Sequence, residues 1–183
     1  ITEDTKAIQL PGSSGTWFLR VRYTGIGWEP LITFRKGKNA EEHRPYFLQA
    51  ENGVLGAYVN NGSQFKSADG IYTTDNYANG DWLNLAVVRT YTGKDYTLRY
   101  YYLIGDSGTW TEISMDYSVT ALDTAEDVIL SLFAEFNAWN NSASNSCTAG
   151  MTYDDFRYYS IALDTNQLTH IVSEVKNGEA QDP

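Results

Sequence analysis

The feature that most constrains this chain is a period-two alternation of apolar and polar residues, first seen clearly near Trp17. In an extended chain, Trp17, Leu19 and Val21 fall on one face, and Arg20 and Arg22 fall on the other. Such alternation is typical of a strand in an antiparallel sheet that has one face in the core. We therefore expect a β-strand whose arginine-bearing face is in contact with water.

Similar runs recur between clusters of Gly, Asn, Asp and Ser, whereas amphipathic helical stretches are nearly absent. The predicted strands cover residues 17–23, 31–35, 45–49, 54–60, 82–91, 96–104, 110–116, 128–136 and 151–159. Two stretches look like loops: residues 66–81, with a short edge strand as the alternative, and residues 137–146. Only residues 164–174 look helical, with Asp164 or Thr165 as the N-cap.

These elements predict an all-β fold, a two-sheet antiparallel β-sandwich (jelly roll) with one short C-terminal helix. The 183 residues, 42% of them hydrophobic and 14% aromatic, fit one such domain and exclude a disordered chain. We expect the domain to span residues 1–175, followed by a tail or the start of a linker at residues 176–183. Because the chain begins at Ile1 without Met, we expect a monomeric module within a longer chain.

Charge and composition exclude several classes of partner. The net charge of −10 disfavours nucleic acid, whose binding needs clustered Lys and Arg. No apolar run approaches the roughly 18 residues that span a bilayer, so we expect no membrane insertion. The single cysteine, Cys147, closes no disulfide within the chain, and its role stays open between a small buried apolar group and a reactive thiol.

Four strings resemble a known family in their order and spacing along the chain. They are KAIQLP at residues 6–11, the paired Asn-Gly turns within residues 46–62, GDWLNLAVV at residues 80–88 and TYDDFRYYSIAL at residues 152–163. The chain is thus similar to the laminin-G-like jelly rolls of the concanavalin A-like lectin and glucanase superfamily, of the bacterial carbohydrate-binding-module type. This family includes carbohydrate-binding modules, lectin domains, adhesins and glucanases, so the resemblance implies the fold and leaves the function open.

The glucanase alternative requires two carboxylates that flank the scissile bond. On one strand these would appear at even spacing, as in E-x-D-x-E, and no such string exists here. His43 and His170 lie beside no nucleophile motif. We therefore expect a noncatalytic domain, with a divergent glycoside hydrolase as a third alternative, because a fold can bring distant carboxylates together.

A sugar site needs exposed aromatic rings beside hydrogen-bonding side chains. Trp139, flanked by Asn137 and Asn140 in a polar loop, fits best, although it is equally consistent with a lid on the core. Trp28 is a second candidate with a stronger structural alternative. Trp17 and Trp82 fall on the apolar phase of strong strands and are predicted to be core residues.

Charged residues supply further candidate ligand contacts. Arg20 and Arg22 could meet Glu135 and form a concave binding face, or they could simply pair across the sheet in water. His43 and Arg44, in the polar loop 36–44, could reach the same rim.

The resemblance also implies a structural Ca²⁺ ion, which many family members hold with Asp side chains and backbone carbonyls. Asp154 shares a strand phase with Phe156 and Tyr158, which should face inward, so its charge needs a partner. Calcium with Glu3 or Asp4 as co-ligands is one answer, and hydrogen bonds from loop amides are the other.

Together these observations favour a noncatalytic carbohydrate-binding module that binds an oligosaccharide or polysaccharide. We expect it to belong to a larger secreted bacterial glycan-active protein, at an extracellular or cell-surface location. The alternative from a different class is a protein-binding adhesin or spacer domain of a cell-surface protein.

Overall fold

The computed structural model describes residues 14–23, 28–36, 46–51, 54–60, 65–67, 81–91, 95–113, 118–120, 128–132, 134–137, 142–146 and 151–179. Side chains are described for residues 14–22, 31–32, 81–91, 97–112 and 152–178. Within these residues the chain forms strands β1 to β13 and one helix, α1, and every strand pair whose register is known is antiparallel. The predicted all-β class with one C-terminal helix is therefore confirmed.

The chain divides into two compact units, each built from segments that are distant in sequence. The first unit holds a five-stranded sheet in the order β10 (Val128–Leu132), β2 (Trp28–Lys36), β3 (Tyr46–Glu51), β4 (Val54–Asn60) and β5 (Phe65–Ser67). It also holds a two-stranded sheet of β11 (Ala134–Asn137) and β12 (Ser142–Ser146).

Strand β12 corrects the prediction of a polar loop over residues 137–146. Its sequence, SASNS, has neither apolar alternation nor β-branched residues, so no local signal favours a strand. The strand exists because β11 provides a hydrogen-bonding partner, in a register that pairs Asn137 with Ser142. Asn137 is accordingly a strand residue and not a loop residue.

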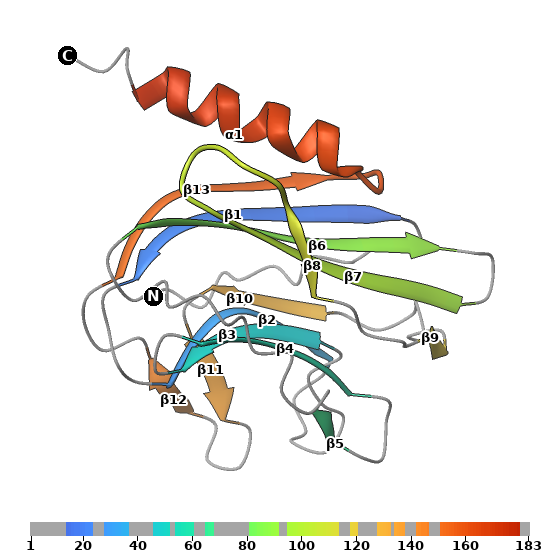
Figure 1. The fold of residues 1–183 in the computed structure, drawn as a ribbon. Coiled ribbons are helices and arrows are strands. Elements are labelled where there is room, and N and C mark those ends of the chain that lie inside the picture. The colour runs from blue at the N-terminus through green and yellow to red at the C-terminus, as the bar shows by residue number, and fades with distance from the viewer. Residues whose placement is uncertain are drawn as a thin grey trace. The chain divides into compact units, whose positions relative to one another are not determined.

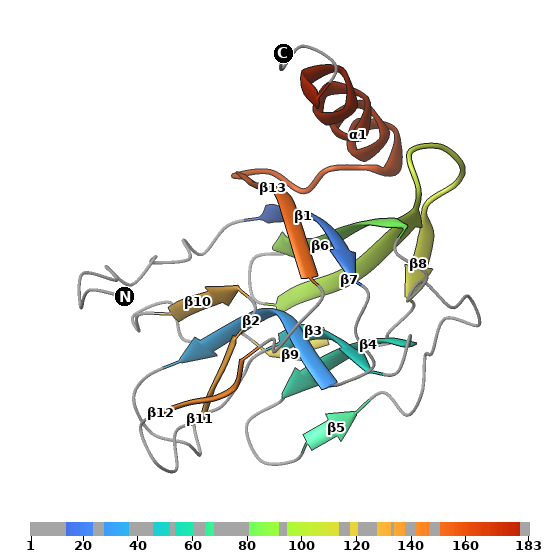
Figure 2. The ribbon, with the colours of Figure 1, turned by 90° about the vertical axis from the view of Figure 1, so that its left-hand side faces the viewer.

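The second unit holds a six-stranded sheet, in which the first and last strands of the chain are neighbours. Its order is β13 (Met151–Tyr159), β1 (Gly15–Tyr23), β6 (Trp82–Tyr91), β7 (Asp95–Ile104) and β8 (Thr111–Ile113), with β9 (Ser118–Thr120) also paired to β7. Helix α1 (Thr165–Glu179) lies over one face of this sheet (Figures 1 and 2). No helix within the described residues has the length and apolarity to cross a membrane.

Helix and sheet share one apolar core. Its buried members are Phe18, Ala86, Val88, Tyr101, Leu103, Trp110, Leu163, Leu168, Ile171, Val172 and Val175. Spacings of three and four residues put Leu168, Ile171, Val172 and Val175 on one stripe of α1. The helix was expected to end at residue 174, but Val175 extends the stripe and the helix continues to Glu179.

The start of α1 is fixed by a reciprocal pair of hydrogen bonds. The Gln167 N–H donates to Asp164 Oδ1 over 2.9 Å, and the Asp164 N–H donates to Gln167 Oε1 over 2.9 Å. This is a capping box, which satisfies two backbone donors that a helix N-terminus would otherwise leave without partners. Asp164 is therefore the N-cap, one of the two predicted candidates.

The expectation that the arginine-bearing face of β1 is in contact with water is wrong at Arg20 and is confirmed at Arg22, which is exposed. Thr16, Phe18 and Arg20 on this face are all 0% exposed, as Val21 is on the opposite face. The expectation rested on the charges of Arg20 and Arg22, but α1 packs on Phe18, and Asp106 and Asp154 contact Arg20. Both faces of β1 are therefore buried from Thr16 to Val21.

Thr16 joins β1 to the segment that leads into α1. Its hydroxyl donates to the Ile161 carbonyl over 2.8 Å and accepts from the Leu163 N–H over 2.9 Å. We expect Thr16→Val to lower the free energy of unfolding by about 1–3 kcal/mol, because it leaves a buried donor and acceptor without partners. Chemical denaturation measures the loss, and Thr16→Ser should recover most of it. Equal stability of the Val and Ser variants would contradict this role.

Candidate functional site

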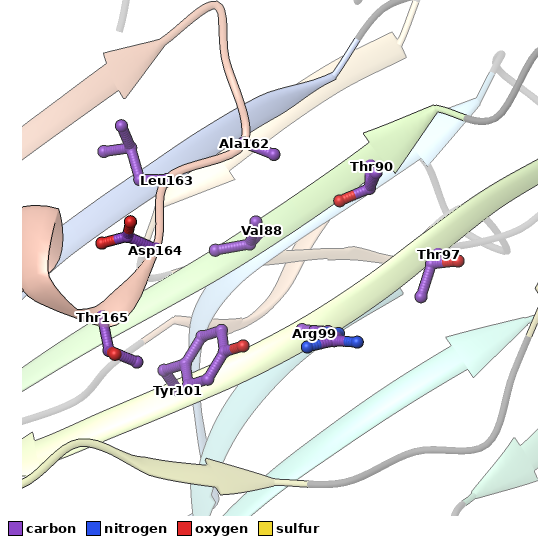
Figure 3. Close-up of a pocket in the computed structure, with 9 residues that line it drawn as sticks. All are labelled: Val88, Thr90, Thr97, Arg99, Tyr101, Ala162, Leu163, Asp164 and Thr165. Atoms are coloured by element: carbon purple, nitrogen blue, oxygen red, sulfur yellow. The ribbon is translucent and has the colours of Figure 1, made fainter.

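A pocket of about 440 Å³ opens on the helix-bearing face of the second unit (Figure 3). Strands β6 and β7 and the connection from β13 to α1 supply its lining. Its apolar lining residues are Val88, Ala162 and Leu163, joined by the ring of Tyr101. Its polar lining residues are Thr90, Thr97, Arg99, Asp164 and Thr165. An apolar floor is thus combined with a rim of hydroxyl, guanidinium and carboxylate groups.

Arg99 is the cation among these lining residues, and its side chain is 56% exposed. A hydrogen bond to Tyr101 and the negative charge of Glu112 raise the pKa of Arg99, and burial acts weakly in the opposite direction. The distance from Arg99 Nε to Glu112 Oε1 is 3.9 Å, which is too long for a hydrogen bond. Arg99 therefore stays charged and keeps donors that face solvent.

A second cluster on the same face of the sheet centres on Arg20, whose side chain is 0% exposed. Arg20 Nη1 lies 2.8 Å from Asp106 Oδ1, and Arg20 Nε lies 2.8 Å from Asp154 Oδ2. A buried guanidinium without such partners would cost several kcal/mol. The two carboxylates, from a loop and from β13, neutralise it.

Asn84 positions the loop that carries Asp106. Its amide Nδ2 donates to the carbonyls of Leu103 and Gly105, over 3.3 and 2.7 Å, and its Oδ1 accepts from Arg20 Nη1 over 3.1 Å. The Gly105 N–H donates to the Trp82 carbonyl over 2.7 Å. Gly105 has a φ of +76°, a conformation that glycine adopts without strain.

Trp82 joins the same cluster as a half-buried ring and not as the core residue predicted from its strand phase. The guanidinium carbons of Arg20 and Arg22 lie 4.5 and 4.4 Å from the centre of its ring. Cation–π contacts of this kind contribute about 0.5–2 kcal/mol. Trp17, in contrast, is 2% exposed and confirms its prediction as a core residue.

The partner of Asp154 is an arginine, which neither alternative from the sequence included. Strand β13 pairs Asp155 with Arg20 and Tyr153 with Val21, so Asp154 is the extra residue of a β-bulge. The bulge breaks the phase shared with Phe156 and Tyr158 and turns Asp154 toward Arg20. Arg20 is therefore a charge partner for Asp154 within the chain.

Calcium stays a prediction. Among the described residues, no three His, Cys, Asp or Glu side chains are grouped so as to hold a metal ion. The co-ligands proposed for Asp154, Glu3 and Asp4, lie outside the described residues.

Arg157 makes a parallel bridge from β13 to α1. Its Nε lies 2.6 Å from Asp155 Oδ2, and its Nη1 lies 2.8 Å from Glu174 Oε2. Burial lowers the pKa of Arg157, but hydrogen bonds to Tyr159, Asp155 and Glu174 outweigh burial and raise the pKa overall. The helix is thus attached to the sheet by charge as well as by apolar contact.

Several predicted ligand contacts lie outside the part of the chain that can be described. Trp28 lies in β2 and Glu135 and Asn137 lie in β11, but their side chains are outside the described set. Trp139, Asn140, His43 and Arg44 are outside it altogether. Their ligand roles, and the predicted meeting of Arg20 with Glu135, stay predictions.

The pocket was not predicted from the sequence. Its walls come from strands β6 and β7 and from residues 162–165, which lie far apart in the sequence. A signal was present in the period-two set Thr97, Arg99 and Tyr101, which puts three polar groups on one face of β7. Tyrosine and threonine are common in strands, so this set did not stand out.

No protein-family model and no curated protein matches the chain. Solved structures do match it. A heptameric SAP-like pentraxin from Limulus polyphemus is 13% identical, with a TM-score of 0.52 over 87% of this chain and 69% of that chain. Domains LG4-5 of the mouse laminin alpha1 chain are 12% identical, with a TM-score of 0.52 over 84% of this chain and 37% of that chain.

The chain has the laminin-G-like jelly-roll fold. This confirms the resemblance seen in the four sequence strings and the predicted two-sheet β-sandwich. At identities of 12% and 13%, the likeness defines the fold and leaves the ligand of this laminin-G-like chain to be argued from its own residues.

We expect Arg20→Met to lower the free energy of unfolding by about 3 kcal/mol, because it leaves two partly buried carboxylates without their cation. Arg99→Met is the matched control on the same sheet, where loss of an exposed pair should cost at most about 1 kcal/mol. Urea denaturation of both variants measures the difference. Equal losses would show that the Arg20 cluster does not stabilise the fold.

Tyr153 provides a test at high pH. Burial, and then the charges of Asp155 and Asp154, raise the pKa of Tyr153 above the ordinary value of 10.0. The folded chain then holds the phenol proton more tightly than the unfolded chain, so this contribution to stability is present below pH 10 and is lost as pH rises through the folded pKa. Tyr153→Phe should lose less stability than the parent above about pH 10. Parallel curves of unfolding free energy against pH would contradict the expectation.

Proposed function

We propose that the chain is a noncatalytic carbohydrate-binding module. The observation that carries the proposal is the pocket of about 440 Å³, with its apolar floor and polar rim. Its volume falls within the range of about 300–1,000 Å³ that is common for small-ligand sites. The laminin-G-like fold supplies a rigid sheet on which strands β6 and β7 hold most of the lining side chains.

The chemistry of the lining matches that of a sugar ring. A pyranose has apolar C–H faces and an edge of hydroxyl groups that donate and accept hydrogen bonds. Val88, Leu163 and the Tyr101 ring can contact such a face. Thr90 and Thr97 hydroxyls can both donate and accept, and the Arg99 guanidinium can only donate.

Absence of catalysis is the second part of the proposal. A glycosidase needs two carboxyl groups about 5–10 Å apart across the scissile bond. The lining residues that the structure describes include one carboxylate, Asp164, and its Oδ1 accepts a hydrogen bond from the Gln167 N–H. Asp106 and Asp154 lie close together, but both contact Arg20. These contacts support binding without turnover.

We further propose that the module is extracellular or at the cell surface, within a larger secreted glycan-active protein. The same fold occurs in domains LG4-5 of the mouse laminin alpha1 chain, and this chain spans 37% of the length of that two-domain structure. Trp139 with Asn137 and Asn140 would extend the contact to a longer saccharide, and a structural Ca²⁺ near Asp154 stays part of the proposal. The adhesin alternative predicts protein binding and no glycan binding.

A glycan-array screen of the intact domain, with and without Ca²⁺, tests the proposal. Thr90→Trp should abolish binding, because the indole fills the pocket from an exposed strand position that tolerates aromatic residues. Thr111→Trp is the matched control, since Thr111 is an exposed strand residue that does not line the pocket. Trp139→Ala tests separately whether the loop tryptophan contributes.

Two results would contradict the proposal. Binding that survives Thr90→Trp but fails in Trp139→Ala would move the site away from the pocket. No binding to any glycan by the parent domain would favour the adhesin or spacer alternative, and hydrolysis of a bound glycan would favour the glycosidase.

A further inference from the structure

The charged groups that line the pocket differ in how strongly they interact with other groups of the protein, and this difference affects which ligand the pocket selects. Among the described residues, its lining contains one cation, Arg99, and one anion, Asp164. Asp164 is engaged as the N-cap of α1, where its carboxylate accepts the Gln167 N–H over 2.9 Å. A carboxylate at that position is also stabilised by the partial positive charge of the helix N-terminus. Asp164 thus has its partner within the protein.

Arg99 interacts more weakly with its protein partner than Asp164 does. Its ion pair with Glu112 is long, at 3.9 Å, and both side chains are more than one-third exposed, at 56% and 39%. Exposed pairs of this kind contribute only about 0–1 kcal/mol, so a better partner can replace Glu112. Tyr101, two residues further along the same face of β7, is the main cause of the raised pKa of Arg99. The donors of Arg99 are thus positioned at the rim and available.

We propose that the pocket selects an acidic sugar, with the carboxylate of a terminal hexuronic or sialic acid residue bound to Arg99. The inference rests on the proposed carbohydrate-binding function. A carboxylate can accept two parallel hydrogen bonds from a guanidinium, which Glu112 does not do at its distance. Thr97 precedes Arg99 by two residues and lines the same wall, so its hydroxyl is placed for a ring hydroxyl of the same sugar.

The net charge of −10 does not exclude an acidic ligand. At physiological ionic strength, charges separated by more than about 8 Å are largely screened, so the groups beside the ligand decide the preference. Among the described residues these groups are Arg99, the capped Asp164 and Glu112. The Glu112 carboxylate repels an acidic ligand. Its removal therefore provides a second test, with the opposite expected change in affinity.

Isothermal titration with paired oligosaccharides tests the inference. One pair ends in glucuronic acid or in glucose, and another ends in sialic acid or in the galactose beneath it. We expect the parent domain to bind the acidic member of at least one pair about tenfold or more tightly, and the pair that responds identifies the acid. Arg99→Gln should bring both members of that pair to nearly equal affinity.

Two further variants test whether the charges beside the ligand, and not the overall charge, set the acidic preference. Glu112→Gln should strengthen binding of the acidic member and leave the neutral member unchanged, because it removes the competing carboxylate. Lys176→Gln is the matched control for Arg99→Gln, since it also removes one positive charge, from an exposed position in the last turn of α1. It should change neither affinity, and the melting temperatures of all variants establish that they are folded.

The outcomes separate this inference from the function on which it rests. Equal binding of acidic and neutral members by the parent, blocked by Thr90→Trp, would overturn the acidic selectivity and leave the carbohydrate site standing. An acidic preference that persists in Arg99→Gln would overturn the role of Arg99. No binding of any member would overturn both the inference and the carbohydrate-binding proposal.

Discussion

The buried guanidinium of Arg20 is the interaction on which the helix-bearing sheet most depends. A charge removed from water needs partners from all sides, and here they come from separate parts of the chain: Asp106 after β7, Asp154 in β13 and Asn84 in β6. Satisfying this one group requires that β1 lie between β13 and β6, and that the β7–β8 loop fold back over the sheet. The cluster therefore specifies strand order as well as contributing to stability.

Polar contacts between distant segments also explain how α1 and the pocket wall are positioned. Arg157 connects β13 to Glu174 on the helix, Thr16 hydrogen-bonds both ends of the Ile161–Leu163 segment, and Asp164 caps the helix. These polar contacts surround the apolar stripe of α1, which packs on the sheet. The pocket wall formed by residues 162–165 is thus fixed by groups that do not themselves contact a ligand. A rigid wall of this kind suits a binding site, because little conformational entropy is lost when the ligand binds.

Much of this architecture could be predicted from the sequence because alternation, turns and caps are local signals. Strands β1, β6, β7 and β13 were predicted within two residues at each end, and Asp164 was one of the two predicted caps. Predictions failed where a partner distant in sequence decides the outcome. Strand β12 depends on β11, the burial of Arg20 depends on two distant carboxylates, and the bulge at Asp154 depends on the register against β1. The pocket failed to stand out for the same reason, since its lining joins residues 88–101 to residues 162–165.

The sequence by itself determined that this chain is all-β with one C-terminal helix, because side-chain periodicity and turn chemistry act between near neighbours. The net charge of −10, which needs no folding to be known, also predicts that nucleic acid is a poor partner. The tertiary structure alone decided which charges are buried, which carboxylates have partners, and which arginine keeps its donors available. Arg20 and Arg99 are chemically identical, yet one is enclosed by Asp106 and Asp154 and the other lies at the rim of a pocket. Only the packing of distant strands separates these roles, because burial and ion pairing arise between residues that the sequence does not place together.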